Sequence, residues 1–359
     1  MASVAKLPEP AGLVIYGLGS VGRSIVDDLL AEGVAVDLIL DRGKRGESYR
    51  SIPILALDDV TDGELAGRAV LIGLHNHYVD IKQIHAELNA AGAVRVLSPV
   101  NLPELAPNAK TRPGYWLDKD FDYAAHEADF ARVRDLLVDE TSRNLFNAIV
   151  TYRQSGDIVD CPAPSLEDEY TPTDLPRLAE PLRVVDCGAF TGVAIHKFLK
   201  AGYAIDSFAA FEPDPDNFAI LASRDFGRDF KIARRLCLPL GTWSKSCQLR
   251  FASDGSMASR LSDAGDTVIQ CVAIDDVLQG EPVNVVKLDV EGAEIETLKG
   301  MRKLIAAQKP ALLVSAYHLP EHLYEIVDLI ESWNLGYRFH LRVHEFNTFG
   351  TVIYAFPER

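Results

Sequence analysis

The stretch Val184-Val-Asp186-Cys-Gly188-Ala-Phe-Thr-Gly192 decides the fold of the C-terminal half of this 359-residue chain. An apolar strand passes there into a glycine-rich turn, and a helical pattern begins directly afterwards. Open α/β sheets bind ligands where strands pass into helices, because glycines let the backbone approach a ligand and the helix N-terminus exposes amide donors. The stretch therefore predicts a doubly wound α/β sheet with a ligand site at this turn.

Strands and helices continue to alternate after this turn, which is typical of a parallel sheet covered by helices. Further strands are predicted at 208–211, 232–236, 283–290 and 311–316, and helices from 193 and at 218–222, 295–307 and 321–332. Residues 337–343 and 351–356 flank a short polar turn. They are predicted to close the chain as an antiparallel pair.

An acidic residue, Glu212, ends the strand that follows the glycine turn. A carboxylate at this place in an α/β sheet can accept the hydrogens of both hydroxyls of a ribose. Glu212, Asp186 and Gly188 together indicate an adenosine-containing ligand without a pyrophosphate. A plain strand-to-helix turn beside a solvated glutamate is the alternative interpretation.

A third motif, Lys287-Leu-Asp289-Val-Glu291-Gly-Ala-Glu294, ends a strongly apolar strand. Alternate residues of a strand share a face, so Lys287, Asp289 and Glu291 are expected on one side. An unpaired charge inside a parallel sheet is costly, so Lys287 is expected to pair with a carboxylate such as Asp289. A purely structural ion pair is the alternative to a functional site.

Several segments together resemble the FkbM-type methyltransferases. They are Asp186-Cys-Gly-Ala-Phe-Thr-Gly192, Phe211-Glu-Pro213, Lys287-Leu-Asp-Val-Glu-Gly-Ala-Glu294, Leu298-Lys-Gly300 and Gly336-Tyr-Arg-Phe-His-Leu-Arg342. The resemblance covers about 182–356. It implies a seven-stranded class I methyltransferase fold, S-adenosylmethionine as methyl donor, and acceptors that are usually hydroxyl groups of sugars or natural products.

The resemblance also assigns residues to the donor site. Asp186, Gly188 and Gly192 would line the methionine side of the donor, and Glu212 would bind its ribose. The rest of the implied donor site consists of Ala189, Phe190, Thr191, Pro213, Asp289 and Glu291.

The chain departs from the family pattern at Ser315-Ala-Tyr317-His318, where many relatives carry an acidic residue. An unperturbed histidine titrates near neutrality, so His318 is a candidate to take the proton of an acceptor hydroxyl. Asp289 is the alternative base, and Lys287 is a further catalytic candidate. Methyl transfer needs no metal, and none is assigned. The side chains that would suffice to hold an ion, if the fold gathered them, are Asp289, Glu291, His318, His340 and His344.

A second glycine turn, Gly17-Leu-Gly19-Ser-Val-Gly22, lies between a short apolar strand and a helical pattern. It matches the dinucleotide-binding fingerprint, and Asp41 stands near the distance expected for a ribose contact. The alternation includes strands at 36–40, 69–74 and 94–97 and a helix at 79–91, and it ends near Pro99. A smaller Rossmann-like domain is therefore predicted, and its use as a nucleotide site, a sensing domain or a scaffold for assembly remains open.

Two proline-rich segments, residues 99–113 and 157–181, mark the expected domain boundaries. Residues 99–113 break the first α/β pattern, residues 123–152 carry apolar positions at helical spacing, and residues 157–181 form a proline-rich acidic loop. That loop is either a passive linker or a lid or substrate loop. We therefore expect a Rossmann-like domain at 1–113, a helical connector and loop at 114–181, and a methyltransferase domain at 182–359.

Composition narrows the possible partners. The net charge of −16 disfavours nucleic acid and anionic membranes, and five cysteines without a CxxC pair favour reduced thiols in a cytoplasmic protein. Residues 1–10 lack the basic start of a secretory signal. The prediction is an O-methyltransferase acting on a small-molecule acceptor, with a homodimer as a possible assembly. An NAD-dependent oxidoreductase or bifunctional enzyme, and a non-catalytic donor-binding protein, are the alternatives.

Overall fold

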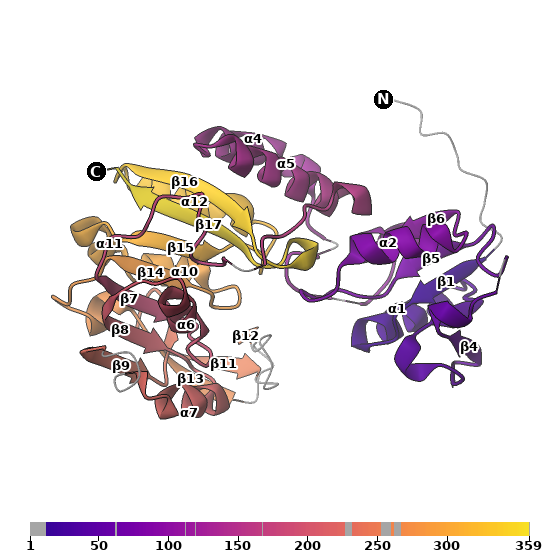
Figure 1. Ribbon diagram of the computed structural model, residues 1–359, viewed down its shortest axis with the longest axis horizontal. Helices are drawn as coiled ribbons and strands as arrows, with labels where there is room; N and C mark the ends of the chain where they lie inside the picture. The colour runs from indigo at the N-terminus through magenta and orange to yellow at the C-terminus, as the bar shows by residue number, and fades with distance from the viewer. Residues whose placement is uncertain are drawn as a thin grey trace. The chain divides into compact units, whose positions relative to one another are not determined.

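The computed structural model describes residues 12–61, 63–111, 113–118, 120–166, 168–226, 232–252, 260–261 and 267–358. The expectation for residues 1–10 lies outside this part of the chain. Among the described residues, no helix combines the length and the apolar character that crossing a membrane requires. The chain folds into two units, each built on its own mostly parallel sheet (Figure 1).

The two units do not follow chain order. Unit 1 comprises residues 1–125, 147–163 and 346–349, and unit 2 comprises residues 126–146, 164–345 and 350–359. The residues predicted as a separate connector, 114–181, are thus divided between both units. Helical spacing shows that one face of a helix is apolar, but it does not show which core that face covers.

Unit 1 contains a six-stranded sheet in the order β3-β4-β2-β1-β5-β6. Its strands are β1 (Leu13–Tyr16), β2 (Leu38–Leu40), β3 (Ser48–Tyr49), β4 (Ile52–Leu55), β5 (Ala69–Ile72) and β6 (Arg95–Leu97). All neighbours pair in parallel except β3 and β4, so the predicted Rossmann-like sheet is confirmed. Strand β4 was not predicted, because Pro53 interrupts its apolar run and proline inside such a run argues against a strand.

The α-helices of unit 1 are α1 (Ser20–Ala31), α2 (Ile81–Ala90) and α3 (Leu102–Leu105). Helix α5 (Glu140–Ser155) contributes to both units. The short 3₁₀ helices of the chain are η1 (Arg42–Lys44), η2 (Leu57–Asp59), η3 (Pro99–Asn101), η4 (Tyr123–His126), η5 (Ile158–Asp160) and η6 (Phe346–Thr348).

Unit 2 contains the predicted seven-stranded sheet, in the order β16-β17-β15-β14-β7-β8-β9. Its strands are β7 (Leu182–Cys187), β8 (Ile205–Phe211), β9 (Arg234–Leu238), β14 (Val285–Leu288), β15 (Ala311–Ser315), β16 (Tyr337–Val343) and β17 (Thr351–Pro357). The first five of these strands pair in parallel, and β16 and β17 are antiparallel as predicted. This arrangement confirms the class I methyltransferase fold.

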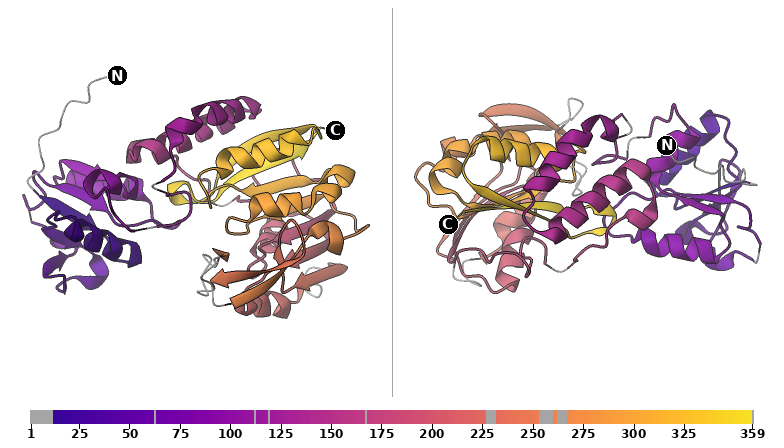
Figure 2. Two further views of the ribbon diagram at one scale, coloured as in Figure 1. Left: turned by 180° about the vertical axis from the view of Figure 1, so that it is seen from behind. Right: turned by 90° about the horizontal axis from the view of Figure 1, so that it is seen from above.

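The helices of unit 2 are α4 (Glu127–Leu136), α6 (Val193–Lys200), α7 (Pro215–Ser223), α9 (Ile274–Val277), α10 (Glu294–Lys299), α11 (Arg302–Gln308) and α12 (His322–Ser332). Helix α4 packs against α12 (Figure 2). One helix was predicted at 295–307, but α10 and α11 are separate. A Cβ atom at Gly300, which lies between them, would come within 2.0 Å of the carbonyl oxygen of Trp243, so the backbone at the break packs closely against another segment.

A small second sheet in unit 2 was not predicted. It consists of β10 (Gly241–Thr242), β11 (Cys247–Ala252), β12 (Arg260–Leu261) and β13 (Thr267–Val272), in the order β10-β13-β11-β12. The sequence of β11 alternates apolar and polar residues, which is the signal by which it could have been found.

The register of the large sheet brings the predicted site residues together. Cys187 pairs with Leu288 on one side and with Phe211 on the other, and Leu288 pairs with Val314. The four strands involved are parallel, so their carboxyl ends lie along one edge of the sheet. The glycine turn, Glu212, Asp289 and His318 all follow directly after these strand ends.

Candidate functional site

The glycine turn after β7 is attached to the end of β8 by backbone hydrogen bonds. The amides of Gly188 and Ala189 both donate to the carbonyl oxygen of Phe211, at 3.0 Å each. The amide of Phe190 donates to Oε2 of Glu212 at 2.7 Å. The turn is thus held in one conformation by the strand end that also carries the predicted ribose-binding carboxylate.

Gly188 and Gly192 are required by the geometry of this turn. Both have a positive φ, +71° and +85°, in the region that favours glycine. A Cβ atom at Gly188 would lie 1.8 Å from the carbonyl oxygen of Asp289, and one at Gly192 would lie 2.7 Å from the ring of Phe226. The glycine turn therefore packs directly against the residue that ends β14.

Glu212 is buried, and each of its carboxylate oxygens accepts one backbone hydrogen bond. Oε2 accepts from the amide of Phe190, and Oε1 accepts from the amide of Asp214 at 2.9 Å. A carboxylate oxygen can accept two hydrogen bonds, so each oxygen retains capacity for a ribose hydroxyl. Burial raises the pKa of Glu212 to about 7, and the two amide hydrogen bonds oppose this rise only in part.

Lys287 does not pair with Asp289, as the sequence suggested, but with Asp186. Its Nζ lies 3.1 Å from Oδ1 of Asp186 and donates to the carbonyl oxygen of Gly188 at 2.5 Å. The expected pairing with a carboxylate is confirmed, but the example named, Asp289, is not the partner, because β14 ends at Leu288 and the register of β14 on β7 places Lys287 beside Asp186. Both charged side chains are buried.

Burial and the neighbouring charges shift the pKa values of Lys287 and Asp186. Burial lowers the pKa of Lys287, but the carboxylates of Asp186 and Asp289 outweigh burial, and the net shift is upward. Burial raises the pKa of Asp186 more than Lys287 lowers it. Among the described residues, none donates a hydrogen bond to Oδ2 of Asp186. A buried carboxylate oxygen without a donor, next to the glycine turn, fits the ammonium group of a bound amino acid moiety.

Two tyrosine hydroxyls hold the side chain of Asp289. Tyr170 donates to Oδ2 at 3.3 Å, and Tyr317 donates to Oδ1 at 3.2 Å. The amide of Tyr170 in turn donates to the hydroxyl of Tyr354 at 3.0 Å. Tyr170 belongs to the proline-rich loop, which therefore contributes a side chain to the site. No pattern in the sequence singled out Tyr170, whereas Tyr317 stands beside the predicted His318.

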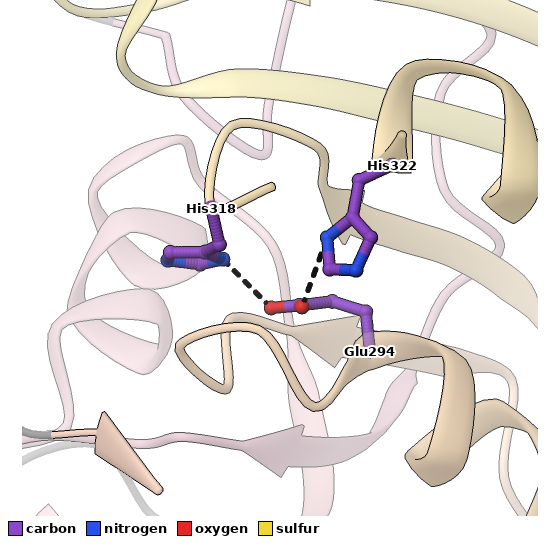
Figure 3. Close-up of side chains that lie close together, drawn as sticks. All are labelled: Glu294, His318 and His322. Atoms are coloured by element: carbon purple, nitrogen blue, oxygen red, sulfur yellow. Dashed lines mark ion pairs between the residues drawn. The ribbon is translucent and has the colours of Figure 1, made fainter. Parts of the chain in front are cut away.

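His318 is buried, and three carboxylates lie near its ring nitrogens; Figure 3 shows one of them, that of Glu294. Its Nδ1 lies 2.8 Å from Oε1 of Glu294. Its Nε2 lies 3.5 Å from Oδ1 of Asp289 and 3.4 Å from Oε2 of Glu291. The other oxygen of Glu294 lies 3.2 Å from Nδ1 of His322. Glu294 and His322 were not predicted as site residues, although Glu294 ends the quoted motif.

The carboxylates decide the protonation of His318. Burial lowers the pKa of His318, but Glu294 and Glu291 outweigh burial and raise it well above the ordinary value of 6.5. The expectation of a titration near neutrality is therefore wrong, because it assumed an imidazole without charged neighbours. The raised pKa makes His318 a poorer acceptor for the proton of another group.

The fold gathers three of the five side chains that the sequence offered as possible metal ligands. Asp289, Glu291 and His318 lie together, whereas the other two histidines lie elsewhere in unit 2. His340 contacts Oδ2 of Asp139 through Nδ1 at 2.6 Å. His344 contacts the carbonyl oxygen of Ser165 at 3.0 Å and the hydroxyl of Tyr354 at 2.7 Å.

In unit 1, the glycines of the first turn have three different environments. Gly17 has a φ of +91°, and a Cβ atom at Gly22 would lie 2.1 Å from the carbonyl oxygen of Gly17. A Cβ atom at Gly19 would meet no atom within 4 Å. Asp41 accepts hydrogen bonds from the amide of Leu18 at 2.8 Å and from Gly43. These environments match the turn, ligand-approach and helix-packing roles of the fingerprint.

Comparison with known proteins finds a family model that matches part of the seven-stranded unit. Residues 186–339 match the model described as the Methyltransferase FkbM domain. A segment of 98 residues is 35% identical to "Hexuronic acid methyltransferase AglP" of Haloferax volcanii, and it spans 26% of this chain and 40% of that relative. The crystal structure of a methyltransferase FkbM from Methylobacillus flagellatus KT matches the fold of 97% of this chain and 90% of that chain, with a TM-score of 0.75 and 21% identity.

These matches confirm the resemblance noted in the sequence. The match to the Methyltransferase FkbM domain covers residues 186–339, and the members of that family use S-adenosylmethionine as their methyl donor.

Proposed function

We propose that this protein binds S-adenosylmethionine at the glycine turn of unit 2 and transfers its methyl group to a hydroxyl of a sugar or another small natural product. The observation that carries the proposal is the pair of buried carboxylates at one sheet edge. Glu212 retains acceptor capacity on both oxygens, and Oδ2 of Asp186 receives no hydrogen bond from the described residues. A ribose and an ammonium group supply the donors that these oxygens lack.

The donor would be held by residues whose positions fit its two polar ends. Asp186, with Gly188 and Gly192, would bind the methionine end, and Glu212 would bind the ribose hydroxyls. Ala189, Phe190, Thr191 and Pro213 supply the backbone around them. Lys287 acts as a positioning residue in this proposal, because its ammonium group holds both Asp186 and the carbonyl of Gly188.

The bound donor supplies a methyl group on a positively charged sulfur, which is a good leaving group. An acceptor oxygen forms a bond to the methyl carbon as the bond from carbon to sulfur breaks, and the hydroxyl proton must pass to a base. We assign this base to Asp289, whose carboxylate is held by Tyr170 and Tyr317. His318 is the less suitable candidate, because its neighbouring carboxylates Glu294 and Glu291 raise its pKa and so stabilise its protonated form.

The acceptor class is supported by the printed name of one relative. "Hexuronic acid methyltransferase AglP" names a sugar acid, which belongs to the class of hydroxyl-bearing acceptors expected here. A sugar or sugar acid is therefore the first acceptor to test.

Donor binding is tested by calorimetric titration of the full chain with S-adenosylhomocysteine. Wild type and the exposed control Glu331→Ala should bind, and Glu212→Ala should bind more weakly. Unchanged affinity in Glu212→Ala contradicts the assignment of Glu212 to the ribose. Transfer is then tested with methyl-labelled donor and a panel of glucuronic acid, galacturonic acid and neutral hexoses. If the protein binds the donor but transfers the methyl group to no acceptor in a broad panel, the result supports the non-catalytic alternative.

We also propose, as a second function, that unit 1 binds a nucleotide. The open space at Gly19 supports this, because a ligand can approach the backbone there without a side chain in the way. An NAD-dependent oxidoreductase or bifunctional enzyme remains the alternative to a methyltransferase with an accessory domain. Equilibrium dialysis of the full chain against NAD distinguishes these two possibilities. The oxidoreductase or bifunctional enzyme requires NAD to bind, whereas a methyltransferase with an accessory domain does not.

A further inference from the structure

We propose that Asp289, Glu291 and His318 form a binding site for a divalent metal ion beside the glycine turn. One ligand atom from each of these residues lies within 4.8 Å of the others. The role of the ion in methyl transfer rests on the function proposed above, but its binding to these side chains does not.

The distances between the ligand atoms fit a coordinated ion. Nε2 of His318 lies 3.5 Å from Oδ1 of Asp289 and 3.4 Å from Oε2 of Glu291. An ion with bonds of about 2.1 Å to tetrahedral ligands separates those ligands by about 3.4 Å. The two separations are therefore those expected along the edges of such a site.

The backbone brings the ligands together at a defined edge. Asp289 follows β14 and His318 follows β15, and these strands pair in parallel. Glu291 has a φ of +54°, a conformation that residues with side chains rarely adopt, and Gly292 follows with +100°. Such conformations persist where the surrounding structure holds them, and they cluster at functional sites. This turn carries the carboxylate of Glu291 back toward His318.

Glu294 orients the imidazole as a metal site requires. Metal-binding histidines almost always donate the hydrogen of their second nitrogen to a carboxylate or carbonyl, which fixes the tautomer and the ring orientation. Glu294 lies 2.8 Å from Nδ1 of His318, and it is itself held by the amide of Val290 at 3.0 Å and by His322 (Figure 3). A hydrogen on Nδ1 directs the lone pair of Nε2 toward Asp289 and Glu291.

The charges also favour a cation. Three carboxylates surround one imidazole, so the cluster has a negative excess even when His318 is protonated. A divalent ion at Nε2 would replace that proton and supply one further positive charge. Imidazole and carboxylate ligands together suit ions such as Mn²⁺ and Zn²⁺.

A second possible group, Glu294, His318 and His322, fits an ion less well. Its two separations of 2.8 and 3.2 Å are those of hydrogen bonds, and all three side chains are buried. The side chains of Asp289 and Glu291 are each 22% exposed. An ion and an acceptor can therefore reach the outer group, which is Asp289, Glu291 and His318. The inner group, Glu294, His318 and His322, orients the imidazole of His318.

Three protein ligands leave coordination positions open, as in catalytic metal sites. An acceptor with two neighbouring oxygens, such as a vicinal diol or a hydroxy acid, would occupy them and chelate the ion. Coordination lowers the pKa of a hydroxyl, so less basicity is required of the proton acceptor. Oδ2 of Asp289 is the oxygen that contacts Tyr170, and it is not one of the proposed metal-binding atoms. It remains the atom that takes the proton.

The test is a titration of the EDTA-dialysed full chain with Mn²⁺, in which the electron paramagnetic resonance signal of free Mn²⁺ reports binding. Wild type should bind one ion, and Asp289→Asn and Glu291→Gln should each weaken binding at least about ten-fold. His322→Gln is the matched control for the inner group and should bind within a few-fold of wild type. Circular dichroism melting confirms that each variant is folded, and calorimetry with S-adenosylhomocysteine follows donor binding separately.

Several results would overturn the proposal. Wild type that binds the donor but neither Mn²⁺ nor Zn²⁺ contradicts the site while leaving the methyltransferase assignment intact. Binding that is lost in His322→Gln but retained in Glu291→Gln moves the ion to the inner group and contradicts the proposed ligands. Methyl transfer that survives EDTA undiminished contradicts the role of the ion. Conversely, Mn²⁺ binding by a protein that transfers no methyl group supports the site and refutes the proposed function.

Discussion

Lys287 and Asp186 lie 3.1 Å apart on the neighbouring parallel strands β14 and β7, and both side chains are buried. The lysine also donates to the carbonyl oxygen of Gly188, so one ammonium group joins the sheet to the glycine turn. Removing one member of a buried pair leaves an uncompensated charge, which is strongly destabilising.

Lys287→Met should therefore lower the free energy of unfolding by about 3–5 kcal/mol, measured by urea denaturation. The control is Lys299→Met, which removes an exposed ion pair with Glu296 and should cost about 0–1 kcal/mol. The double variant Lys287→Met with Asp186→Asn should recover part of the loss, because the remaining buried group is neutral. If Lys287→Met and Lys299→Met lower the free energy of unfolding equally, the buried pair contributes no more to stability than the exposed pair.

Gly188→Ala should abolish measurable donor binding. The new Cβ atom would lie 1.8 Å from the carbonyl oxygen of Asp289, a backbone atom that can move only if the turn moves. Gly202→Ala is the matched control, because Gly202 also has a positive φ, +80°, but a Cβ atom there meets nothing within 4 Å. Calorimetry should show near-normal donor affinity for Gly202→Ala. Normal affinity in Gly188→Ala would contradict the close packing of the turn on β14.

Donor affinity should increase with pH across neutrality. Burial raises the pKa of Glu212 to about 7, so the carboxyl group is mostly protonated at pH 6 and mostly ionised at pH 8. Only the ionised form accepts hydrogen bonds from both ribose hydroxyls, so affinity should rise by up to about ten-fold per pH unit below the pKa. Glu212→Gln should remove this dependence, and its curve corrects for titration of the ligand. Parallel curves for both proteins would exclude Glu212 as the titrating group.

The two glycines of the first turn should respond differently to substitution. Gly22→Ala places a Cβ atom 2.1 Å from the carbonyl oxygen of Gly17 and should destabilise unit 1 by about 1–3 kcal/mol, as overpacking does. Gly19→Ala meets no atom within 4 Å and should leave the unit folded. Hydrogen exchange in peptides from residues 12–40 measures both effects. If unit 1 binds a nucleotide, Gly19→Ala should weaken that binding without changing the exchange pattern.

The sequence by itself determined the fold class, the two glycine turns and the acidic residue after β8. Each of these signals is local: hydrophobic periodicity sets a helix or a strand, and glycine at a strand end sets a turn that a ligand can approach. The antiparallel pair β16 and β17 was predictable for the same reason. Pro53 in β4 shows the limit of such signals, because tertiary pairing formed a strand against the local preference.

The tertiary structure alone decided which charged groups meet. Asp186 rather than Asp289 neutralises Lys287, because the register of β14 on β7 selects the partner. Tyr170 reaches Asp289 from a distant loop, and Glu294 lies beside Nδ1 of His318, while His340 and His344 lie elsewhere. Strand order and register bring together residues that are far apart in the chain, and burial then changes their pKa values. Neither effect leaves a periodic signal in the sequence.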